Sequence, residues 1–342
     1  MAMERRLSPV YIEDLDWQDQ RFAIHSYVRN TFLRDSLERH GVLGPPWLLQ
    51  TSQGPPVIVD GFKRLKWLKD GGTNRVECVL FEAVGDPRDL MLQRLEAKIC
   101  GALLNLAEKA QIVARLAELL PEQRVLQDYF PALGLAARPR AMEHWSRVAA
   151  AEKLLLSALA HERLCERVAL ELIDWPLDER DGLIALLCEL RCSASIQLEI
   201  LERASEIALI QGRTRTALLA SSEVQDIVQD PDRNHRQRTQ NLRDLLQRWR
   251  YPRLWARQER FRRGLGECGL PPAMRVQPPP AFEGNSWQLQ IQFSSPEELS
   301  QLLTSAQALA SSQKLPELLG RSKTGESESN HENTKVRKHE KK

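Results

Sequence analysis

The run from Phe32 to Val79 constrains the fold of this chain most, because it combines helix, turn and strand signals at short spacing. An amphipathic pattern predicts a helix that ends at Gly41, and Pro45 and Pro46 then lead into an extended segment. An apolar strand follows at Pro56–Val59. Further strands are predicted at Val10–Ile12, Trp47–Leu49 and Val76–Leu80, so the N-terminal part combines helices with a sheet.

The strand at Pro56–Val59 runs directly into Asp60–Arg64, which opens a basic helix. A glycine at a helix start leaves backbone N–H groups free beside the positive end of the helix dipole, an arrangement that suits phosphate. The Gly41–Pro46 turn is expected to form the other wall of this pocket. The alternatives are a plain strand–helix turn with a solvated basic face and a plain helix C-cap. The predicted phosphate-binding residues are Gly41, Pro45, Gly61, Lys63 and Arg64.

This run resembles the N-terminal domain of ParB-type partition proteins. In that family a helix ends in Ser-Ile-x-x-x-Gly-x-x-x-Pro, a strand follows, and Gly-Glu-Arg-Arg or Asp-Gly-x-Arg-Arg begins the next helix. Here Ser36-Leu37, Gly41, Pro45-Pro46 and Asp60–Leu65 occupy those places. The resemblance covers residues 8 to 82 and extends to about residue 230.

The resemblance implies a ParB/sulfiredoxin-like α/β domain that binds the triphosphate of CTP, with Mg²⁺, through Gly61, Lys63 and Arg64. It also implies a cytoplasmic, bacterial, nucleoid-located protein with DNA as its partner, acting in chromosome or plasmid partitioning or in nucleoid-associated regulation. The third nucleotide motif of the family is Glu-Asn-x-Gln-Arg. Aligned on Asn105 and Glu108, it falls on Ala97–Gly101, and none of its specified residues is matched there. Glu96 and Lys98 are the available substitutes. We therefore expect no CTP hydrolysis, and the pocket either holds a nucleotide or has become structural.

The length of 342 residues predicts two or three domains in an α+β chain. The ParB-like domain is expected at residues 8–85. From Asp86 the chain is predicted to be helical to residue 230, beginning with an Asp86-Pro87 cap and a capping box at Asn105 and Glu108. The expected helices that follow lie near 122–130, 139–160, 162–173, 178–190, 194–211 and 214–228.

The C-terminal part is expected to contain a basic helix or linker at 231–252, a small αββα module at 253–311 and a disordered tail at 312–342. The module's strands are predicted at Met274–Gln277 and Trp287–Phe293, and its last helix begins at the Ser295 cap. One face of that helix is apolar, which predicts a homodimer contact through Leu299, Leu302, Leu303, Ala306 and Leu309.

A degenerate helix-turn-helix is predicted around Val125–Phe130, a turn at Leu133–Leu135 and a second helix from Pro139. In that interpretation the second helix enters the major groove of DNA. The alternative is an ordinary helical hairpin with surface arginines. The DNA-contacting residues would be Arg138, Arg140, His144 and Arg147.

Residues 233–263 hold eleven arginines against two acids, in a chain whose formal net charge is only +2. Arginines neutralise backbone phosphates, and the interleaved Trp249, Tyr251, Trp255 and Phe261 can stack on bases. The alternative is a solvated basic helix between two domains. The expected DNA contacts are Arg236, Arg238, Arg243, Arg248, Arg250 and Arg257.

Other classes of function find no support in the sequence. No apolar run reaches the ~18 residues of a membrane span, and the N-terminus carries no secretory signal. The histidines and cysteines show no metal-ligand spacing, and we expect no metal site of the protein's own and no catalytic residue. The sequence therefore favours a ParB-like DNA-binding protein. The alternatives are an enzyme on the same fold, such as a nucleotide-dependent kinase or a nuclease, and a protein-interaction scaffold.

Overall fold

The computed structural model describes residues 4–29, 31–51, 54–82, 86–284, 286–312 and 314–319. The chain divides into two compact units, Met1–Leu246 and Gln247–Lys342. The division falls inside helix α14 (His235–Arg250), within the segment expected to be a basic helix or linker. None of the described helices is both long enough and apolar enough to cross a membrane.

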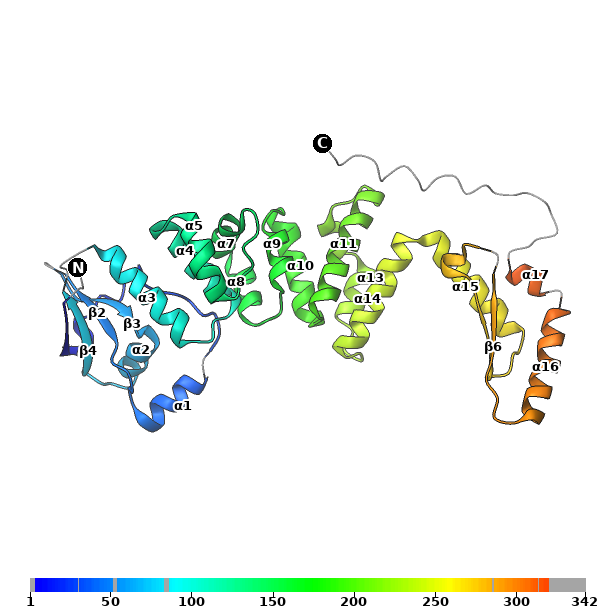
Figure 1. Ribbon diagram of the computed structural model, residues 1–342, viewed down its shortest axis with the longest axis horizontal. Coiled ribbons are helices and arrows are strands. Elements are labelled where there is room, and N and C mark those ends of the chain that lie inside the picture. Colours follow the sequence, from blue (N-terminus) through cyan, green and yellow to red (C-terminus); the bar gives the residue numbers. More distant parts are fainter. Residues whose placement is uncertain are drawn as a thin grey trace. The chain divides into compact units, whose positions relative to one another are not determined.

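The first unit opens with a four-stranded mixed sheet, drawn in blue in Figure 1. Its strands, β1 (Arg5–Tyr11), β2 (Trp47–Gln50), β3 (Val57–Asp60) and β4 (Arg75–Glu82), follow the order β1-β4-β2-β3. Strand β2 is parallel to β4, and the other pairings are antiparallel. All four expected strands are present. Strand β1 is longer than predicted, because this edge strand is largely exposed and so lacks the apolar alternation that marks a strand.

Both faces of the sheet are covered, which explains the continuous apolar run in β3. On one face Leu49, Val59 and Phe81 pack with Phe22 and with Leu90 of α3 (Pro87–Gly101). On the other face a cluster packs against α2 (Phe62–Asp70); its buried members are Leu15, Leu48, Ile58, Leu65, Cys78 and Leu80. Helix α1 (Thr31–His40) precedes β2 in the chain. Strand β3 is thus held between two helices, and its last residue, Asp60, has a fixed position.

The predicted caps that begin the helical part are confirmed. The Asp86 side chain accepts a hydrogen bond from the backbone of Arg88, and Asn105 and Glu108 form the full capping box of α4 (Leu106–Leu119). The helices that follow are α5 (Glu122–Arg124), a π-helical turn (Val125–Tyr129), α6 (Phe130–Leu133), α7 (Ala141–Ala149), α8 (Lys153–Ala160), α9 (Glu166–Leu172), α10 (Leu177–Leu190), α11 (Ala194–Gln211), α12 (Arg215–Leu219), α13 (Ser222–Val228) and α14.

The single helix expected at 139–160 is wrong, because the segment forms two helices that bury different side chains. Both helices pack on α4 and α9, and α8 packs on α10 as well. The extended backbone at Glu152 makes the break between them. Trp145 of α7 and Leu155 of α8 are both fully buried, so each half contributes to the core on its own.

Helix α14 combines a basic face with a buried apolar stripe. Leu242, Leu245 and Leu246 are buried, and the Thr239 hydroxyl donates hydrogen bonds to the carbonyls of His235 and, at 3.4 Å, Leu190 of α10. The buried leucines and the Thr239 bond thus hold this part of α14 against the helical part of the first unit.

The second unit contains α15 (Pro252–Glu267), the antiparallel pair β5 (Met274–Gln277) and β6 (Gln288–Ile291), α16 (Pro296–Ala310) and α17 (Lys314–Leu318). The Ser295 cap is confirmed by a 3.1 Å bond from the Glu298 backbone. Strand β6 is shorter than the predicted Trp287–Phe293, since Trp287 instead packs in a ring cluster with Phe261 and Phe282.

Helix α17 corrects the prediction that the segment 312–342 is disordered from its start. Its residue Leu318 lies against Gly264 of α15, where a β-carbon would come within 2.6 Å of the Leu318 side chain. The glycine therefore makes room for an apolar contact that orders this short helix. Residues 320–342 lie outside the described residues.

Candidate functional site

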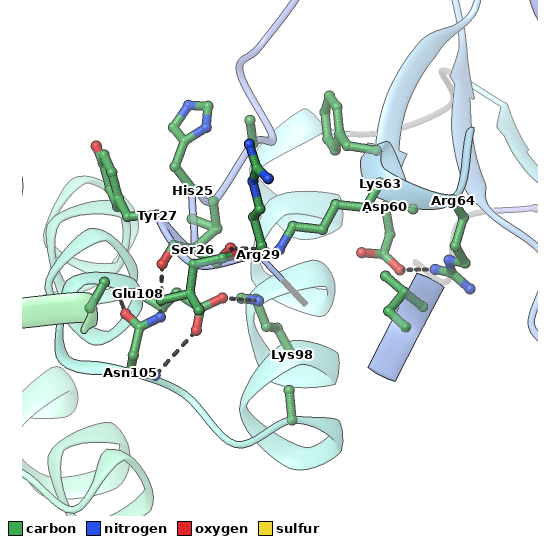
Figure 2. Close-up of a pocket in the computed structure, with 18 of the residues that line it drawn as sticks. His25, Ser26, Tyr27, Arg29, Asp60, Lys63, Arg64, Lys98, Asn105 and Glu108 are labelled. Atoms are coloured by element: carbon green, nitrogen blue, oxygen red, sulfur yellow. Dashed lines mark hydrogen bonds and ion pairs between the residues drawn. The ribbon is translucent and has the colours of Figure 1, made fainter. Parts of the chain in front are cut away.

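A cavity of about 900 Å³ lies in the first unit, where three stretches of chain meet. The first stretch is the segment between Gln20 and Leu33, and the second is the Asp60–Arg64 turn that joins β3 to α2. The third consists of side chains from α3, α4 and their connection, among them Arg94, Lys98 and Glu108 (Figure 2). The turn that the sequence marked as a phosphate site therefore lines a real cavity.

The Asp60–Arg64 turn depends on Gly61. Its φ of +90° lies in the left-handed region, which favours glycine. A β-carbon at this position would also lie 2.9 Å from Cβ of the buried Pro46. No side chain caps the start of α2, so this helix keeps free N–H groups near the cavity.

Asp60 forms ion pairs with two arginines at the cavity wall, and Figure 2 shows the pair with Arg64. Its Oδ2 lies 2.6 Å from Arg64 Nη2, and its Oδ1 lies 2.8 Å from Arg94 Nη2. Arg94 also donates through Nε to the carbonyl of Val59 at 3.0 Å, and Arg64 donates through Nη1 to that of Gly44. Arg64, predicted as a phosphate ligand, is thus engaged in joining β3, α2 and the turn before β2.

Lys63 extends from the same turn in another direction, and its Nζ lies 2.5 Å from Ser26 Oγ (Figure 2). The side chain reaches solvent along part of its length. The protein atoms around the ammonium nonetheless desolvate it and lower its pKa, as does the positive charge of Lys98, while Glu108 opposes the shift. Lys63 is therefore the predicted ligand whose charge faces the cavity.

Lys98 and Glu108 form the opposite side of the site. Lys98 Nζ lies 2.9 Å from Glu108 Oε1, and both side chains are mostly buried. Glu108 Oε2 accepts the backbone N–H of Asn105 at 3.2 Å, which is part of the capping box. The sequence identified Lys98 as a substitute for the missing third motif, and it does line the cavity. Glu96, the other substitute, accepts the hydroxyl of Tyr129 instead.

A segment that sequence analysis overlooked, Gln20–Arg29, forms the remaining wall, and we call it the strap. Gln111 of α4 accepts the N–H of His25 at 2.8 Å and donates to its carbonyl at 2.7 Å. Asn105 Nδ2 donates to the carbonyl of Ser26 at 2.9 Å. Tyr27 has a φ of +57°, which is strained for a side chain of this size. The strap has no periodic pattern, so no signal in the sequence marks it.

The cavity is strongly cationic. Among the described residues that line it, five carry positive charge and two carry negative charge, a formal excess of three positive charges. The cations are Arg29, Lys63, Arg64, Arg94 and Lys98, and the anions are Asp60 and Glu108. Gly41 and Pro45, predicted to form a wall of the pocket, are not among its lining residues. Gly41, with a φ of +67°, has the left-handed backbone of a helix-ending glycine.

The predicted helix-turn-helix residues lie on either side of the start of α7. Gly134 is left-handed, as expected for a turn, and residues 134–140 separate α6 from α7. Arg138 and Arg140 are exposed, whereas His144 is half-buried. Arg147 forms an ion pair with Asp174 at 2.5 Å and donates to the carbonyl of Ile173, so its guanidinium is held by these contacts at the protein surface.

The predicted arginines of α14 differ in how they are held. Arg236 is exposed, Arg238 donates to the carbonyls of Val228 and Arg233, and Arg243 forms an ion pair with Glu199 at 2.9 Å. These two contacts hold Arg238 and Arg243 within the first unit.

Three predicted arginines of the second unit lie over aromatic rings. Arg248 lies over Trp255 at 5.5 Å, Arg250 over Tyr251 at 4.8 Å and Arg257 over Phe282 at 5.1 Å. The exposed Arg253 and Arg260 share the face of α15 with Arg257, since the three are spaced four and three residues apart. The spacing of these arginines in the sequence already places all three on one helix face. The sequence prediction named only Arg257 among them as a DNA contact.

Comparison with protein-family models and with curated proteins finds no match. Among solved structures, the chain is similar to a pNOB8-like ParB N-domain, with 14% identity over 72% of this chain and 98% of that one, at a TM-score of 0.32. The same N-domain in a second crystal form matches with 15% identity over 68% and 95%, at 0.30. A C-terminally truncated ParB from Caulobacter crescentus, complexed with CTP-γ-S, matches with 20% identity over 53% and 98%, at 0.23. These structures belong to the family that the sequence resembles. At this low similarity, a function has to be argued from the residues of this chain and not from these structures.

Replacing Gly61 by alanine is expected to destabilise the first unit, because the side chain would be strained and would contact Pro46. The matched control is Gly72→Ala at the other end of α2, where φ is +74° but nothing lies within 4 Å. The control should lose about 1–2 kcal/mol of unfolding free energy, and Gly61→Ala should lose more. Urea denaturation measures both, and equal losses would show that the close approach to Pro46 has no energetic weight.

Proposed function

We propose that this chain is a ParB-like DNA-binding protein that holds the polyphosphate of a nucleotide in the cationic cavity. The observation that carries the proposal is the position of Lys63 and Lys98, whose ammonium groups line the same cavity from α2 and α3. Both carboxylates of the site are paired, Asp60 with Arg64 and Arg94 and Glu108 with Lys98, and the lining still carries a formal excess of three positive charges that attracts an anionic ligand. A phosphate chain is the biological anion that best matches several converging cations.

The start of α2 adds to this charge. Free N–H groups and the positive end of the helix dipole lie at Gly61, beside the Lys63 side chain. The cavity also has apolar groups for the rest of a nucleotide, since Tyr27, Phe32 and Leu103 line it. Its volume is in the range of small-ligand sites, about 300–1,000 Å³.

CTP is the nucleotide to test first, because the Caulobacter crescentus ParB structure is a complex with CTP-γ-S. We do not propose hydrolysis. The residues that align with the third nucleotide motif of the family do not match it, and Glu96 is bound to Tyr129. The cavity in this proposal binds a nucleotide and orders the strap against α4.

Lys63→Met is expected to weaken CTP binding by about tenfold or more, because one charge-assisted hydrogen bond contributes about 1.5–3 kcal/mol. The control is Lys66→Met, one turn further along α2, where the exposed side chain does not line the cavity. Calorimetric titration of the full chain with CTP measures both affinities. Equal affinities in the two variants would contradict the assignment of Lys63.

The affinity for CTP is expected to depend on pH through the same lysine. Burial lowers the pKa of Lys63 below its ordinary value of 10.5. The protonated form binds phosphate, so affinity should be full at lower pH and should decline as the pH rises through this lowered pKa. Titrations across the alkaline range measure the decline, which Lys63→Met should remove; a decline unchanged in that variant would assign it to another group.

DNA binding is proposed for the basic segment 233–263. Its exposed arginines on α15, namely Arg253, Arg257 and Arg260, form one stripe in the second unit. In the first unit Arg236, Arg138 and Arg140 are also exposed. Backbone phosphates attract such arginines without regard to base sequence, and a preferred site would need contacts to base edges as well. A helix-turn-helix role for Arg138 and Arg140 belongs to the same proposal.

Replacing Arg253, Arg257 and Arg260 together by glutamine is expected to weaken DNA binding and to flatten its salt dependence. The slope of log affinity against log salt should fall by about 0.9 for each phosphate that the variant no longer neutralises. The matched control removes three exposed arginines of the first unit, Arg88, Arg124 and Arg167. Fluorescence anisotropy on mixed-sequence duplexes across a salt series measures both. Equal effects of the two triple variants, or no DNA binding by the unaltered chain at low salt, would contradict the DNA proposal.

A further inference from the structure

The acidic side chains that line the cavity are fully engaged by cations and backbone groups. Each oxygen of Asp60 is paired with an arginine, at 2.6 Å to Arg64 and 2.8 Å to Arg94. Glu108 binds Lys98 through Oε1 and the Asn105 N–H through Oε2. No carboxylate among the described lining residues therefore has an oxygen without a positively charged or hydrogen-bonding partner.

The neutral oxygens near these acids are also occupied. Asn105 Oδ1 accepts the backbone N–H of Glu108 at 3.0 Å, and its Nδ2 donates to the strap. Ser26 Oγ lies beside Lys63 and donates to the carbonyl of Val28. Across the residues that the structure describes, no group of three or more His, Cys, Asp or Glu side chains is placed to hold a metal ion.

Magnesium does not fit these donors. The ion requires near-octahedral oxygen ligands, loses its water reluctantly, and is normally held at nucleotide sites by one or two carboxylates together with phosphates. Here each carboxylate already has a cationic group within 3 Å. A dication would have to displace an arginine or a lysine and then remain beside it, which like-charge repulsion opposes.

We infer that the cavity binds its polyphosphate as the metal-free anion, with the ammonium groups of Lys63 and Lys98 in the place of Mg²⁺. This inference rests on the proposed nucleotide site and departs from the Mg²⁺ that the sequence resemblance implied. Free nucleoside triphosphate is more negative than its magnesium complex, so the cationic cavity attracts the free form more strongly. Magnesium therefore competes with the protein for the ligand.

The test is calorimetric titration of the full chain with CTP and with inorganic triphosphate, in EDTA and in saturating Mg²⁺. We expect both ligands to bind in EDTA and saturating Mg²⁺ to lower the affinity. Binding that is lost in EDTA, or whose affinity Mg²⁺ leaves unchanged or raises, would overturn this inference while the nucleotide site stands. Absence of binding in both conditions would overturn the nucleotide site together with it.

Two variants of the ion pair separate the roles of its members. Glu108→Gln keeps the capping box, because glutamine also serves at this position, and it releases Lys98. Its affinity in EDTA should rise, whereas a metal site that uses Glu108 would lose its affinity. Lys98→Met should weaken metal-free binding by about tenfold.

The variant Lys98→Met leaves Glu108 buried without its partner, so folding has to be controlled. The double variant Lys98→Met/Glu108→Gln removes both charges and restores neutrality. It should bind as weakly as Lys98→Met in EDTA. Unaltered affinity of the double variant would show that Lys98 does not contact the anion, and would contradict the inference.

Discussion

The contact of Asp60 with two arginines holds the site together. Asp60 ends β3, Arg64 comes from α2 and Arg94 from α3, so one carboxylate joins the sheet to the helices on its two faces. Arg94 is buried, with 7% of its surface exposed, and that burial lowers its pKa against the opposing effect of Asp60. Removing one partner of a buried ion pair costs about 3–5 kcal/mol, because the remaining charge is left without compensation. The geometry of the cavity therefore depends on Asp60 keeping both arginines as partners.

The neighbouring cations of the site have different roles. Arg64 and Arg94 neutralise Asp60 and fix the turn, and Gly61 lets the chain pass close to Pro46. Lys63, in the same turn, extends instead to the strap, whose backbone is bound to α4 through Gln111 and Asn105. A ligand that binds Lys63 and Lys98 thus contacts α2 and α3 at once and lies beside the strap, to which Lys63 is hydrogen-bonded. In the proposed function, nucleotide binding is therefore expected to stabilise the strap against α4.

Much of this architecture follows from local sequence patterns. Four strands, the Asp86 and Asn105 caps and the Gly61 turn were predictable, because each depends on residues close together in the chain. The cavity as a whole was not, since it needs contacts such as His25 with Gln111, 86 positions apart. The same reason explains Arg147 and Arg243. Their sequence context suggests exposed DNA ligands, but the fold brings Asp174 and Glu199 to them.

The cationic cavity is proposed to receive a phosphate chain on Lys63 and Lys98, and the nucleotide-binding proposal depends on that contact. The most direct measurement is a crystal structure of the full chain with CTP bound in the presence of EDTA. We expect phosphate oxygens at hydrogen-bonding distance, about 2.7–3.2 Å, from both ammonium groups, with the Asp60 and Glu108 ion pairs intact. Phosphates bound outside the cavity, or held by an ion that has replaced Arg64, Arg94 or Lys98 on these carboxylates, would contradict it.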